Sequence, residues 1–381
     1  MKKPFYNNFR LGVLGGGQLG RMLIQEAINL NIQIVSLDPD KDAPCKDLAT
    51  DFVVGDLQDF KAVYDFGKTV DMLTIEIEHV NVDALQKLEE EGLPVYPQSR
   101  VLKIVQDKGL QKEFYKKNNI PSSAFFLIEN KNEIGKYASE FPFMQKLRKG
   151  GYDGRGVTRL TDPGNLNNAF DEPSVLEKFI DFEKEISVII ARNKTGETKC
   201  FPITELEFNP EVNLVEYLFA PAAVTPSVEQ EAYEIAEKIV IALDFIGILA
   251  VEMFLCKDGK ILVNEIAPRA HNSGHHTIEA NYTSQYEQHL RSILNLPLGS
   301  TKSLSPAVMV NLLGEKGFSG EAVYQGFENV VAVEGVKIHL YGKKNTKPYR
   351  KMGHITILDE SLEKAKEKAE WVKNELKIIS N

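Results

Sequence analysis

The sequence predicts a multidomain protein of mixed α/β and α+β class, and three observations lead to this expectation. Its 381 residues exceed what one ordinary hydrophobic core holds, so two or three domains are expected. Residues 10–95 alternate short apolar strands with helical stretches, which is typical of a parallel α/β domain. From about residue 120 onward closely spaced strands dominate, which indicates an antiparallel-rich α+β region.

The first domain is expected to span residues 1–105. Its strands are predicted over Arg10–Leu14, Gln33–Leu37 and Met72–Glu76, and a helix over Gly20–Leu30. A helix-rich stretch, Val101–Asn118, leads into the second domain.

The second domain, residues 106–187, is expected to be a small lobe. Strands over Phe143–Leu147 and Ser174–Phe179 would enclose a glycine-rich loop. The third domain, residues 188–381, would hold a larger lobe with a helix over Glu229–Leu243. Its other predicted elements are strands over Val188–Ala191, Cys200–Glu207, Ser303–Leu313 and Lys337–Tyr341, and a terminal helix over Leu362–Lys377.

Composition excludes several classes of protein. A formal net charge of −9 and a pI near 5.5 argue against a nucleic-acid-binding surface. No apolar run reaches the ~18 residues of a membrane span, and Leu11–Leu14 is too short for a secretory signal. Three scattered cysteines make no disulfide framework or CxxC site. We therefore expect a soluble cytoplasmic protein that binds neither nucleic acid nor membrane.

Two carboxylates are the most informative feature of the chain. Glu252 and Glu265 lie in apolar runs separated by a loop that contains Asp258-Gly259, a strong hairpin signal. A two-residue loop would give cross-strand pairs whose numbers sum to 517, so that Glu252 lies opposite Glu265 on one face. Because like charges repel, a cation is expected between them. Mg²⁺ held by carboxylates and substrate phosphates is the usual arrangement at nucleotide sites, and a merely solvated polar face is the alternative.

A first glycine-rich segment, Gly15–Gly20, fits GxGxxG after a strand and before a helix, and Asp38 follows about twenty residues later. This is the dinucleotide fingerprint, so an NAD(P)-dependent oxidoreductase is one hypothesis. Glycines that open a helix, however, expose backbone N–H groups to any anion, including a sugar phosphate. Asp38 could equally belong to a polar turn.

A second glycine-rich segment, Lys149–Gly156, has four glycines among its last seven residues, together with Arg155. Such a flap can close over a triphosphate and donate backbone N–H groups and charge. Lys146 precedes it on a predicted strand and would reach a phosphate. An ordinary surface turn is the alternative.

A third cluster follows Glu265. His271, His275 and His276 lie within six residues, beside Arg269 and Asn272. Zinc is conceivable because imidazole is a good ligand, but no cysteine lies nearby to complete a site. Arginine with asparagine and histidine better fits a pocket for a small oxyanion such as bicarbonate, carboxylate or phosphate.

Taken together, these segments resemble the ATP-grasp superfamily, and within it the family of 5-(carboxyamino)imidazole ribonucleotide synthetases. The resemblance extends over nearly the whole chain. It rests on Gly15–Met22 (GGGQLGRM), Leu37–Pro39, Gly150–Gly156 (GGYDGRG), Asn264–Arg269 (NEIAPR), His271–His275 (HNSGH), Pro306–Gly314 (PAVMVNLLG) and Arg350–His354 (RKMGH).

The resemblance implies an ATP-grasp fold with an N-terminal parallel α/β pre-domain, a small glycine-flap lobe and a larger C-terminal lobe. It further implies a homodimeric ligase of purine biosynthesis. ATP, bicarbonate and 5-aminoimidazole ribonucleotide would give the N-carboxylated ribonucleotide through carboxyphosphate, with Mg²⁺. A sister ATP-grasp ligase that uses another acid or amine is the strongest alternative, whereas a non-catalytic scaffold would have no need of both glutamates and the flap.

Residue roles follow from the same resemblance. Glu252 and Glu265 would bind Mg²⁺, with Asn264 beside them. The nucleotide would contact Arg100, Lys108, Lys146, Gly150, Gly151, Tyr152, Asp153, Gly154, Arg155, Gly156, Glu177, Lys178, Phe179, Ile180, Glu185, Asn264 and Glu265.

Arg269 and Asn272 resemble the bicarbonate pocket. The ribonucleotide would contact Gly17, Gln18, Leu19, Glu76, Tyr152, Asp153, Lys343, Arg350 and Lys351, with the basic residues facing its 5′-phosphate. The catalytic residues would be Asp153, Arg155, Arg269, Asn272 and Lys343, and Asp153 would orient or deprotonate the amine. The chain departs from the family at Phe208, where a nucleotide-contacting histidine is usual, and at Ala270, where proline is usual.

Overall fold

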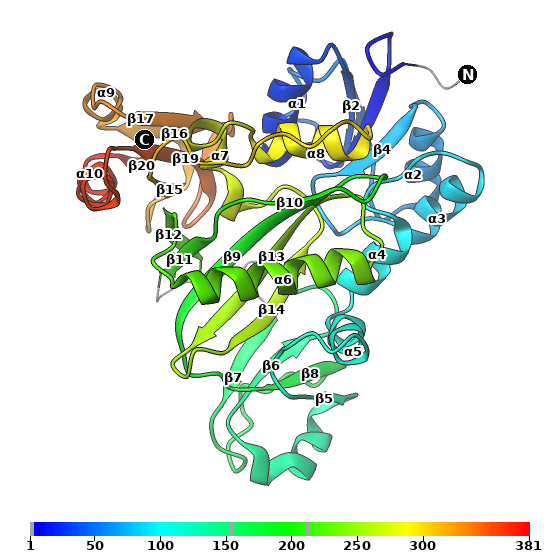
Figure 1. The fold of residues 1–381 in the computed structure, drawn as a ribbon, viewed down its shortest axis with the longest axis vertical. Coiled ribbons are helices and arrows are strands. Elements are labelled where there is room, and N and C mark those ends of the chain that lie inside the picture. Colours follow the sequence, from blue (N-terminus) through cyan, green and yellow to red (C-terminus); the bar gives the residue numbers. More distant parts are fainter. Residues whose placement is uncertain (1–3, 152–155, 210–213) are drawn as a thin grey trace.

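The computed structural model describes residues 4–151, 156–209 and 214–381 (Figure 1). Its strands form four sheets, and the largest of these has nine strands. The chain therefore has the mixed α/β and α+β architecture that its sequence predicts.

The N-terminal domain has a four-stranded parallel sheet in the order β3-β2-β1-β4. Three of its strands confirm the prediction, but β3 was missed because it has only four residues, mostly exposed at the edge of the sheet. The elements are β1 (Arg10–Leu14), α1 (Gln18–Asn29), β2 (Gln33–Asp38), β3 (Asp51–Val54), α2 (Phe60–Gly67), β4 (Met72–Ile75), α3 (Val82–Glu90) and α4 (Ser99–Val105).

The small lobe contains a second four-stranded sheet, antiparallel, in the order β5-β8-β6-β7. It lies at the end of the molecule farthest from the N-terminal domain (Figure 1). Its elements are α5 (Lys108–Lys117), β5 (Phe125–Ile128), the 3₁₀ segment η1 (Lys131–Glu140), β6 (Phe143–Leu147), β7 (Val157–Leu160) and β8 (Ser174–Lys178).

The nine-stranded sheet runs β14-β13-β9-β11-β12-β15-β19-β17, with β10 beside β9. Its first part consists of β9 (Phe182–Arg192), β10 (Thr198–Cys200), β11 (Thr204–Phe208), β12 (Val215–Ala220), β13 (Gly247–Cys256) and β14 (Ile261–Ala267). One strand was predicted over Cys200–Glu207, but the chain forms two there, separated by Phe201-Pro202-Ile203. Strand β9 runs through residue 187, where the sequence predicts a domain boundary. The domain boundaries stay predictions.

The C-terminal part completes this sheet and adds a three-stranded sheet, β18-β16-β20. Its strands are β15 (Ala307–Leu313), β16 (Gly320–Gln325), β17 (Val336–Leu340), β18 (Asn345–Thr346), β19 (Lys351–Leu358) and β20 (Lys377–Ser380). Its helical segments are η2 (Asn272–Gly274), α7 (Thr277–Ala280), α8 (Gln285–Ile293), α9 (Phe327–Val331) and α10 (Leu362–Glu375).

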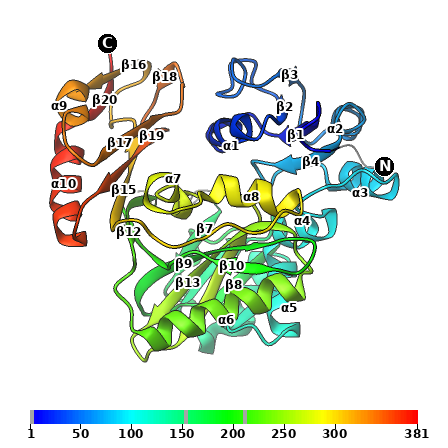
Figure 2. The same ribbon diagram turned by 45° about the horizontal axis from the view of Figure 1, so that its top comes forward.

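The two faces of the nine-stranded sheet differ. One face packs Ile186 and Val188 of β9 and Val251 of β13 against α6 (Pro226–Ala242), which Thr225 caps. On the other side α7 and α8 lie between the N-terminal domain and the C-terminal strands (Figure 2). This face therefore gathers segments from the beginning, middle and end of the chain.

Two further properties concern the protein's environment. Among the described helices, none is both long and apolar enough to cross a membrane. Cys45, Cys200 and Cys256 are free thiols.

Candidate active site

The β13–β14 hairpin brings Glu252 directly opposite Glu265, as predicted. Two departures from the predicted register cancel. The loop has three residues, closed by Cys256 N–H donating to the Lys260 carbonyl at 2.8 Å, with Gly259 at φ 81°. Pairs near the loop therefore sum to 516, and a β-bulge then restores 517 at the glutamates. The prediction of the pair is confirmed, and that of a uniform register is wrong.

The bulge leaves Asn264 without a partner residue on β13. Ile261, Val263 and Ile266 all enter the core, so their spacing changes from two residues to three across it. Asn264 and Glu265 consequently share the face opposite the core, although they are sequence neighbours. This places an amide and two carboxylates on one surface.

Lys108 supplies a cation to this surface. Asp107 caps α5, accepting from the N–H groups of Gly109 and Leu110, so Lys108 is the first residue of the helix. Its Nζ lies 3.0 Å from Glu265 Oε2. The positive end of the helix dipole disfavours a cation at this position. The negative charge of Glu265 offsets that unfavourable interaction.

Lys146 reaches the same surface from the small lobe. Its Nζ donates to Asn264 Oδ1 at 2.9 Å and lies 3.1 Å from Glu177 Oε1. The other Glu177 oxygen lies 2.9 Å from Lys112 Nζ and accepts from Ser123 at 2.7 Å. Burial raises the pKa of Glu177, but Lys146 and Lys112 outweigh it and bring the pKa to about 2. Both Glu177 oxygens therefore position lysines, and the expected role of this residue at the nucleotide stays a prediction.

The two opposed glutamates differ electrostatically. Burial, then the charges of Glu265 and Glu185, raise the pKa of Glu252. Lys108, then Lys146, lower the pKa of Glu265 despite burial. Burial also raises the pKa of Glu185, to about 7. The predicted repulsion therefore falls mainly on Glu252, and the protein's own lysines neutralise Glu265.

The loop after β14 holds the predicted oxyanion residues. Arg269 Nε lies 2.8 Å from Glu78 Oε1, and His271 Nε2 lies 3.6 Å from Glu252 Oε1. Asn272 Nδ2 is buried and has no hydrogen-bond partner among the described residues. A buried amide donor without a partner is costly unless a ligand or water satisfies it. This donor of Asn272, beside Arg269, fits a pocket for a small oxygen-rich anion.

The first glycine-rich segment encloses Glu76. Glu76 Oε2 accepts from the N–H groups of Leu19 and Gly20, at 3.1 and 3.0 Å. A Cβ at Gly15 would lie 2.4 Å from Glu76 Cγ, and one at Gly17 would lie 2.6 Å from Glu76 Oε1. These glycines are therefore required by an internal carboxylate. Two of the N–H groups that would attract a phosphate at this helix N-terminus already bind Glu76.

Asp38, the candidate ribose acid of the dinucleotide hypothesis, is also engaged. Its Oδ2 accepts from Gly16 N–H at 2.7 Å and its Oδ1 from Asp40 N–H at 2.8 Å. It is therefore the residue of a polar turn, which was the alternative interpretation.

The C-terminal basic residues reach the same region through a second bulge. Leu312 pairs with Gly353 and Leu313 with Lys351, so Met352 is unmatched. Met352 enters the core, and Lys351 consequently shares a face with His354. The charge of Lys351 acts on Glu252, and Lys343 Nζ donates to the Lys351 carbonyl at 2.7 Å. Arg350 Nη1 donates to the Asn345 carbonyl at 2.8 Å.

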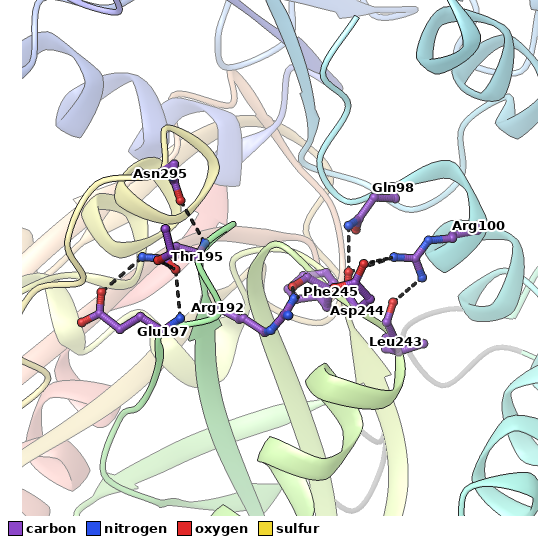
Figure 3. Close-up of polar contacts among 10 residues, drawn as sticks. Gln98, Arg100, Arg192, Thr195, Glu197, Leu243, Asp244, Phe245 and Asn295 are labelled. Atoms are coloured by element: carbon purple, nitrogen blue, oxygen red, sulfur yellow. Dashed lines mark hydrogen bonds and ion pairs between the residues drawn. The ribbon is translucent and has the colours of Figure 1, made fainter. Parts of the chain in front are cut away.

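Arg100, predicted to contact the nucleotide, makes other contacts. Its guanidinium donates to the carbonyls of Leu243 and Asp244 and lies 3.3 Å from the Asp244 carboxylate (Figure 3). Gln98 donates to the same Asp244 carbonyl, and Arg192 binds its carboxylate. Arg100 thus fastens α4 to the turn after α6, and within the described part of the chain none of its hydrogen bonds or ion pairs joins it to the lysine–glutamate cluster.

The other residues predicted to contact the nucleotide differ in their exposure and in their contacts. The ring of Phe179 is partly exposed beneath the Arg159 guanidinium, at 4.1 Å, and Ile180 beside it is half-buried. Lys178 pairs with Glu140. Phe208 packs against an apolar cluster and offers no hydrogen bond where the family usually has histidine. Gly150, Gly151 and Gly156 lie at the base of the flap, while Tyr152, Asp153, Gly154 and Arg155 are outside the described residues.

Sequence reasoning missed several residues that build the site. Arg148 binds Asp107 through two hydrogen bonds, of 2.9 and 2.8 Å, and so joins the end of β6 to the start of α5. Lys112 and Glu78 were likewise missed. The break in apolar alternation at Ile261, Val263 and Ile266 was the one available signal of the bulge.

The donor set fits Mg²⁺ chemically. Glu252, Glu265 and the amide oxygen of Asn264 are hard oxygen ligands on one face, which is the ligand class that Mg²⁺ prefers. Among the described residues there is no group of three or more histidine, cysteine, aspartate or glutamate side chains arranged to hold a metal. Substrate phosphates would therefore have to complete such a site.

Family models match three parts of the chain. A ribonucleotide synthetase preATP-grasp domain matches residues 9–106, an ATP-grasp domain 113–286, and a phosphoribosylaminoimidazole carboxylase C-terminal domain 307–368.

Similar whole proteins are known. The N5-carboxyaminoimidazole ribonucleotide synthase of Bacillus subtilis (strain 168) is 35% identical over 365 residues, covering 94% of this chain and 93% of that protein. The chain spans about two thirds of plant and yeast relatives named phosphoribosylaminoimidazole carboxylase.

Solved structures are also similar. The crystal structure of N5-carboxyaminoimidazole ribonucleotide synthetase from Thermotoga maritima has a TM-score of 0.90 and 44% identity, covering 98% of this chain and all of that one. An Aspergillus clavatus N5-carboxyaminoimidazole synthase, solved with ADP and 5-aminoimidazole ribonucleotide, has a TM-score of 0.88 and 35% identity, covering 97% and 98%.

The unequal environments of the glutamates predict opposite effects on stability. In metal-free protein, Glu265→Gln should lower the free energy of unfolding by about 1 kcal/mol, because it leaves Lys108 without its partner. Glu252→Gln should leave it unchanged or raise it, because the fold disfavours that charge. Chemical denaturation with chelator measures both variants. Electron paramagnetic resonance should show weaker Mn²⁺ binding in each, with nucleotide present. The reverse order of stabilities would contradict this electrostatic assignment.

Proposed function

Because the chain belongs to the family of N5-carboxyaminoimidazole ribonucleotide synthetases, which have the ATP-grasp fold, we propose that it carboxylates 5-aminoimidazole ribonucleotide. ATP and bicarbonate would be the other substrates, and 5-(carboxyamino)imidazole ribonucleotide, ADP and phosphate the products, in purine biosynthesis. The convergence at Glu252 carries the proposal. His271 lies 3.6 Å away, Glu265 lies opposite, and the charges of Arg269 and Lys351 act on it.

The reaction has two covalent steps. Bicarbonate is a poor electrophile, so one of its oxygens first attacks the γ-phosphorus of ATP and ADP leaves, which forms carboxyphosphate. The amine of the ribonucleotide then attacks the carboxyl carbon, inorganic phosphate leaves, and the nitrogen loses a proton. Carboxyphosphate reacts with water, so the site must exclude solvent until the amine attacks.

The nucleotide side is proposed to use cations already gathered there. Lys108 and Lys146 would turn from Glu265 and Asn264 toward the phosphates, where their charge stabilises the transferring group. The segment Glu177–Ile180 and Glu185 would line the adenine and ribose, with Glu177 acting through the lysines. When bound to Glu252, Glu265 and Asn264, Mg²⁺ would screen negative charge on the phosphates. The flap residues Gly150–Gly156 would cover them.

The bicarbonate pocket is proposed at the loop after β14. Asn272 Nδ2, buried without a partner among the described residues, would donate to a bicarbonate oxygen. Arg269, held by Glu78 at 2.8 Å, would add a fixed positive charge. This pocket lies in the loop that also carries His271, so carboxyphosphate would form beside Glu252.

The ribonucleotide is proposed to lie between the N-terminal domain and the C-terminal strands. Gly17, Gln18 and Leu19 would contact it beside Glu76, whose half-buried carboxylate would accept hydrogen bonds from ribose hydroxyls. Lys343, Arg350 and Lys351 would face its 5′-phosphate. Tyr152, Asp153 and Arg155 would approach its amine, with Asp153 orienting it or accepting its proton.

Two broader properties are also proposed. Three free thiols fit a reducing compartment, which supports a cytoplasmic location. A homodimer follows from the family resemblance, and sedimentation velocity would test it. A sister ATP-grasp ligase with another acid or amine is the alternative, since the lysine–glutamate cluster alone does not select the acceptor.

Substrate dependence gives the first test of this function. Sustained ADP formation should require ATP, Mg²⁺, bicarbonate and 5-aminoimidazole ribonucleotide together, because without the amine carboxyphosphate stays in the closed site and only slow hydrolysis allows another turnover. A coupled ADP assay with each substrate omitted in turn measures this. Turnover that persists in bicarbonate-depleted buffer when formate or an amino acid is added would place the chain among the sister ligases.

The 5′-phosphate assignment gives a second test. Arg350→Ala should raise the Michaelis constant for the ribonucleotide about ten- to hundredfold, the size of one charge-assisted contact of ~1.5–3 kcal/mol. The constant for ATP should stay nearly the same. Lys347→Ala is the matched control, because Lys347 is an exposed cation on the same segment. Equal effects of Arg350→Ala on both constants would remove Arg350 from the phosphate site.

A further inference from the structure

Three histidines stack face to face beside the proposed site. The rings of His339 and His354 have centroids 4.4 Å apart and an interplanar angle of 6°. His354 and His275 follow at 4.6 Å and 29°. His339 and His354 are directly opposed on β17 and β19, whereas His275 comes from the segment between η2 and α7. We call these three residues the imidazole column.

Each ring of the column is fixed by a hydrogen bond. His339 Nε2 bonds Glu279 Oε1 at 2.6 Å, and His354 Nδ1 bonds the Tyr341 hydroxyl at 3.0 Å. His275 Nδ1 bonds Gln285 Nε2 at 3.2 Å. The column therefore ties α7 and α8 to β17 and β19, which are antiparallel neighbours in the sheet.

Gln285 also determines the protonation of the column's inner end. Its Oε1 accepts from the His271 N–H and its Nε2 donates to the His271 carbonyl, both at 2.8 Å. The amide orientation is thus set by the backbone, and Nε2 must be a donor toward His275 Nδ1. His275 is then neutral with its proton on Nε2. Burial likewise lowers the pKa of His275 and His354 well below the ordinary value, and neutral rings stack without charge repulsion.

The column joins the two groups of residues that the proposed function assigns to different substrates. Asn272 precedes His275 by three residues, in the loop that Gln285 clamps. Lys351 precedes His354 by three residues and shares its face because of the Met352 bulge. Tyr341, which bonds His354, precedes Lys343 by two residues. The three stacked rings therefore connect the loop that carries Asn272 to the segments that carry Lys343 and Lys351.

We propose that His339, His354 and His275 are positioning residues that set the loop carrying Asn272 against Lys343, which follows β17, and Lys351, which begins β19, so that the activated carboxyl group forms within reach of the bound amine. The inference rests on the proposed function. Within the described residues, no hydrogen bond, ion pair or ring contact joins the column to Lys108 or Lys146, so its influence on ATP should be small. Small displacements of positioned groups have large kinetic effects.

Variants at the centre of the column test this. His354→Leu should raise the Michaelis constant for the ribonucleotide about tenfold and release ADP with less carboxylated product per ADP, while the constant for ATP changes less than twofold. His354→Phe, which keeps a ring in the stack, should restore most of both losses. Thr356→Val is the matched control, since Thr356 is a fully buried residue two positions along β19, and it should behave as wild type.

The column proposal falls if folded His354→Leu keeps wild-type coupling and constants, if ATP is affected as much as the ribonucleotide, or if His354→Phe is no better than His354→Leu. If His354→Leu does not fold, His339→Leu and His339→Phe replace the pair, because His339 lies at the partly exposed end of the column. Wild-type protein that never requires bicarbonate and the ribonucleotide would instead overturn the proposed function, whatever the variants do.

Discussion

Repulsion between two opposed carboxylates organises this protein's site. Glu252 and Glu265 face each other across β13 and β14, and the two carboxylates have different electrostatic environments. Lys108 at the start of α5 and Lys146 on β6 neutralise Glu265, while burial and neighbouring carboxylates leave Glu252 with a raised pKa. The half-neutralised pair is then ready for a cation that arrives with a nucleotide. The same arrangement is expensive without ligands, which is typical of sites built to bind charge.

Two β-bulges make this arrangement possible. One, at Asn264, turns two neighbouring polar residues toward the same face, and the other, at Met352, turns Lys351 toward it from the far side of the sheet. Regular alternation would have sent one of Asn264 and Glu265, and also Lys351, into the core, where an unpaired polar group costs stability. In the sequence, one bulge precedes the loop that carries Arg269 and Asn272 and the other follows it. The imidazole column connects that loop to β19. Residues proposed for the nucleotide, Asn264 and Glu265, and one proposed for the ribonucleotide, Lys351, thereby belong to the same sheet.

Much of this could be predicted from local patterns, and the failures have physical causes. Strand periodicity and an Asp-Gly loop predict Glu252 opposite Glu265, and the structure confirms the pair although the loop is one residue longer than assumed. The glycines at positions 15 and 17 were predictable as a close backbone approach, but not that Glu76 would be the group approached. Family resemblance assigns Arg100 to the nucleotide, which stays a prediction, but the carbonyls that its guanidinium binds are brought near only by tertiary packing and could not be foreseen. Pairs such as Lys112 with Glu177 join distant segments and carry no local signal.

Transfer of the γ-phosphoryl group of ATP to bicarbonate is the central claim, and isotope transfer tests it most directly. Wild-type enzyme would be mixed rapidly with ¹⁸O-labelled bicarbonate, ATP, Mg²⁺ and 5-aminoimidazole ribonucleotide, and the released phosphate examined by ³¹P nuclear magnetic resonance. Carboxyphosphate requires that the oxygen bridging carbon and phosphorus leave with phosphate. We therefore expect phosphate that carries one ¹⁸O atom, formed in step with the carboxylated product. Unlabelled phosphate would show that water or the ribonucleotide attacks ATP directly, and would contradict the account.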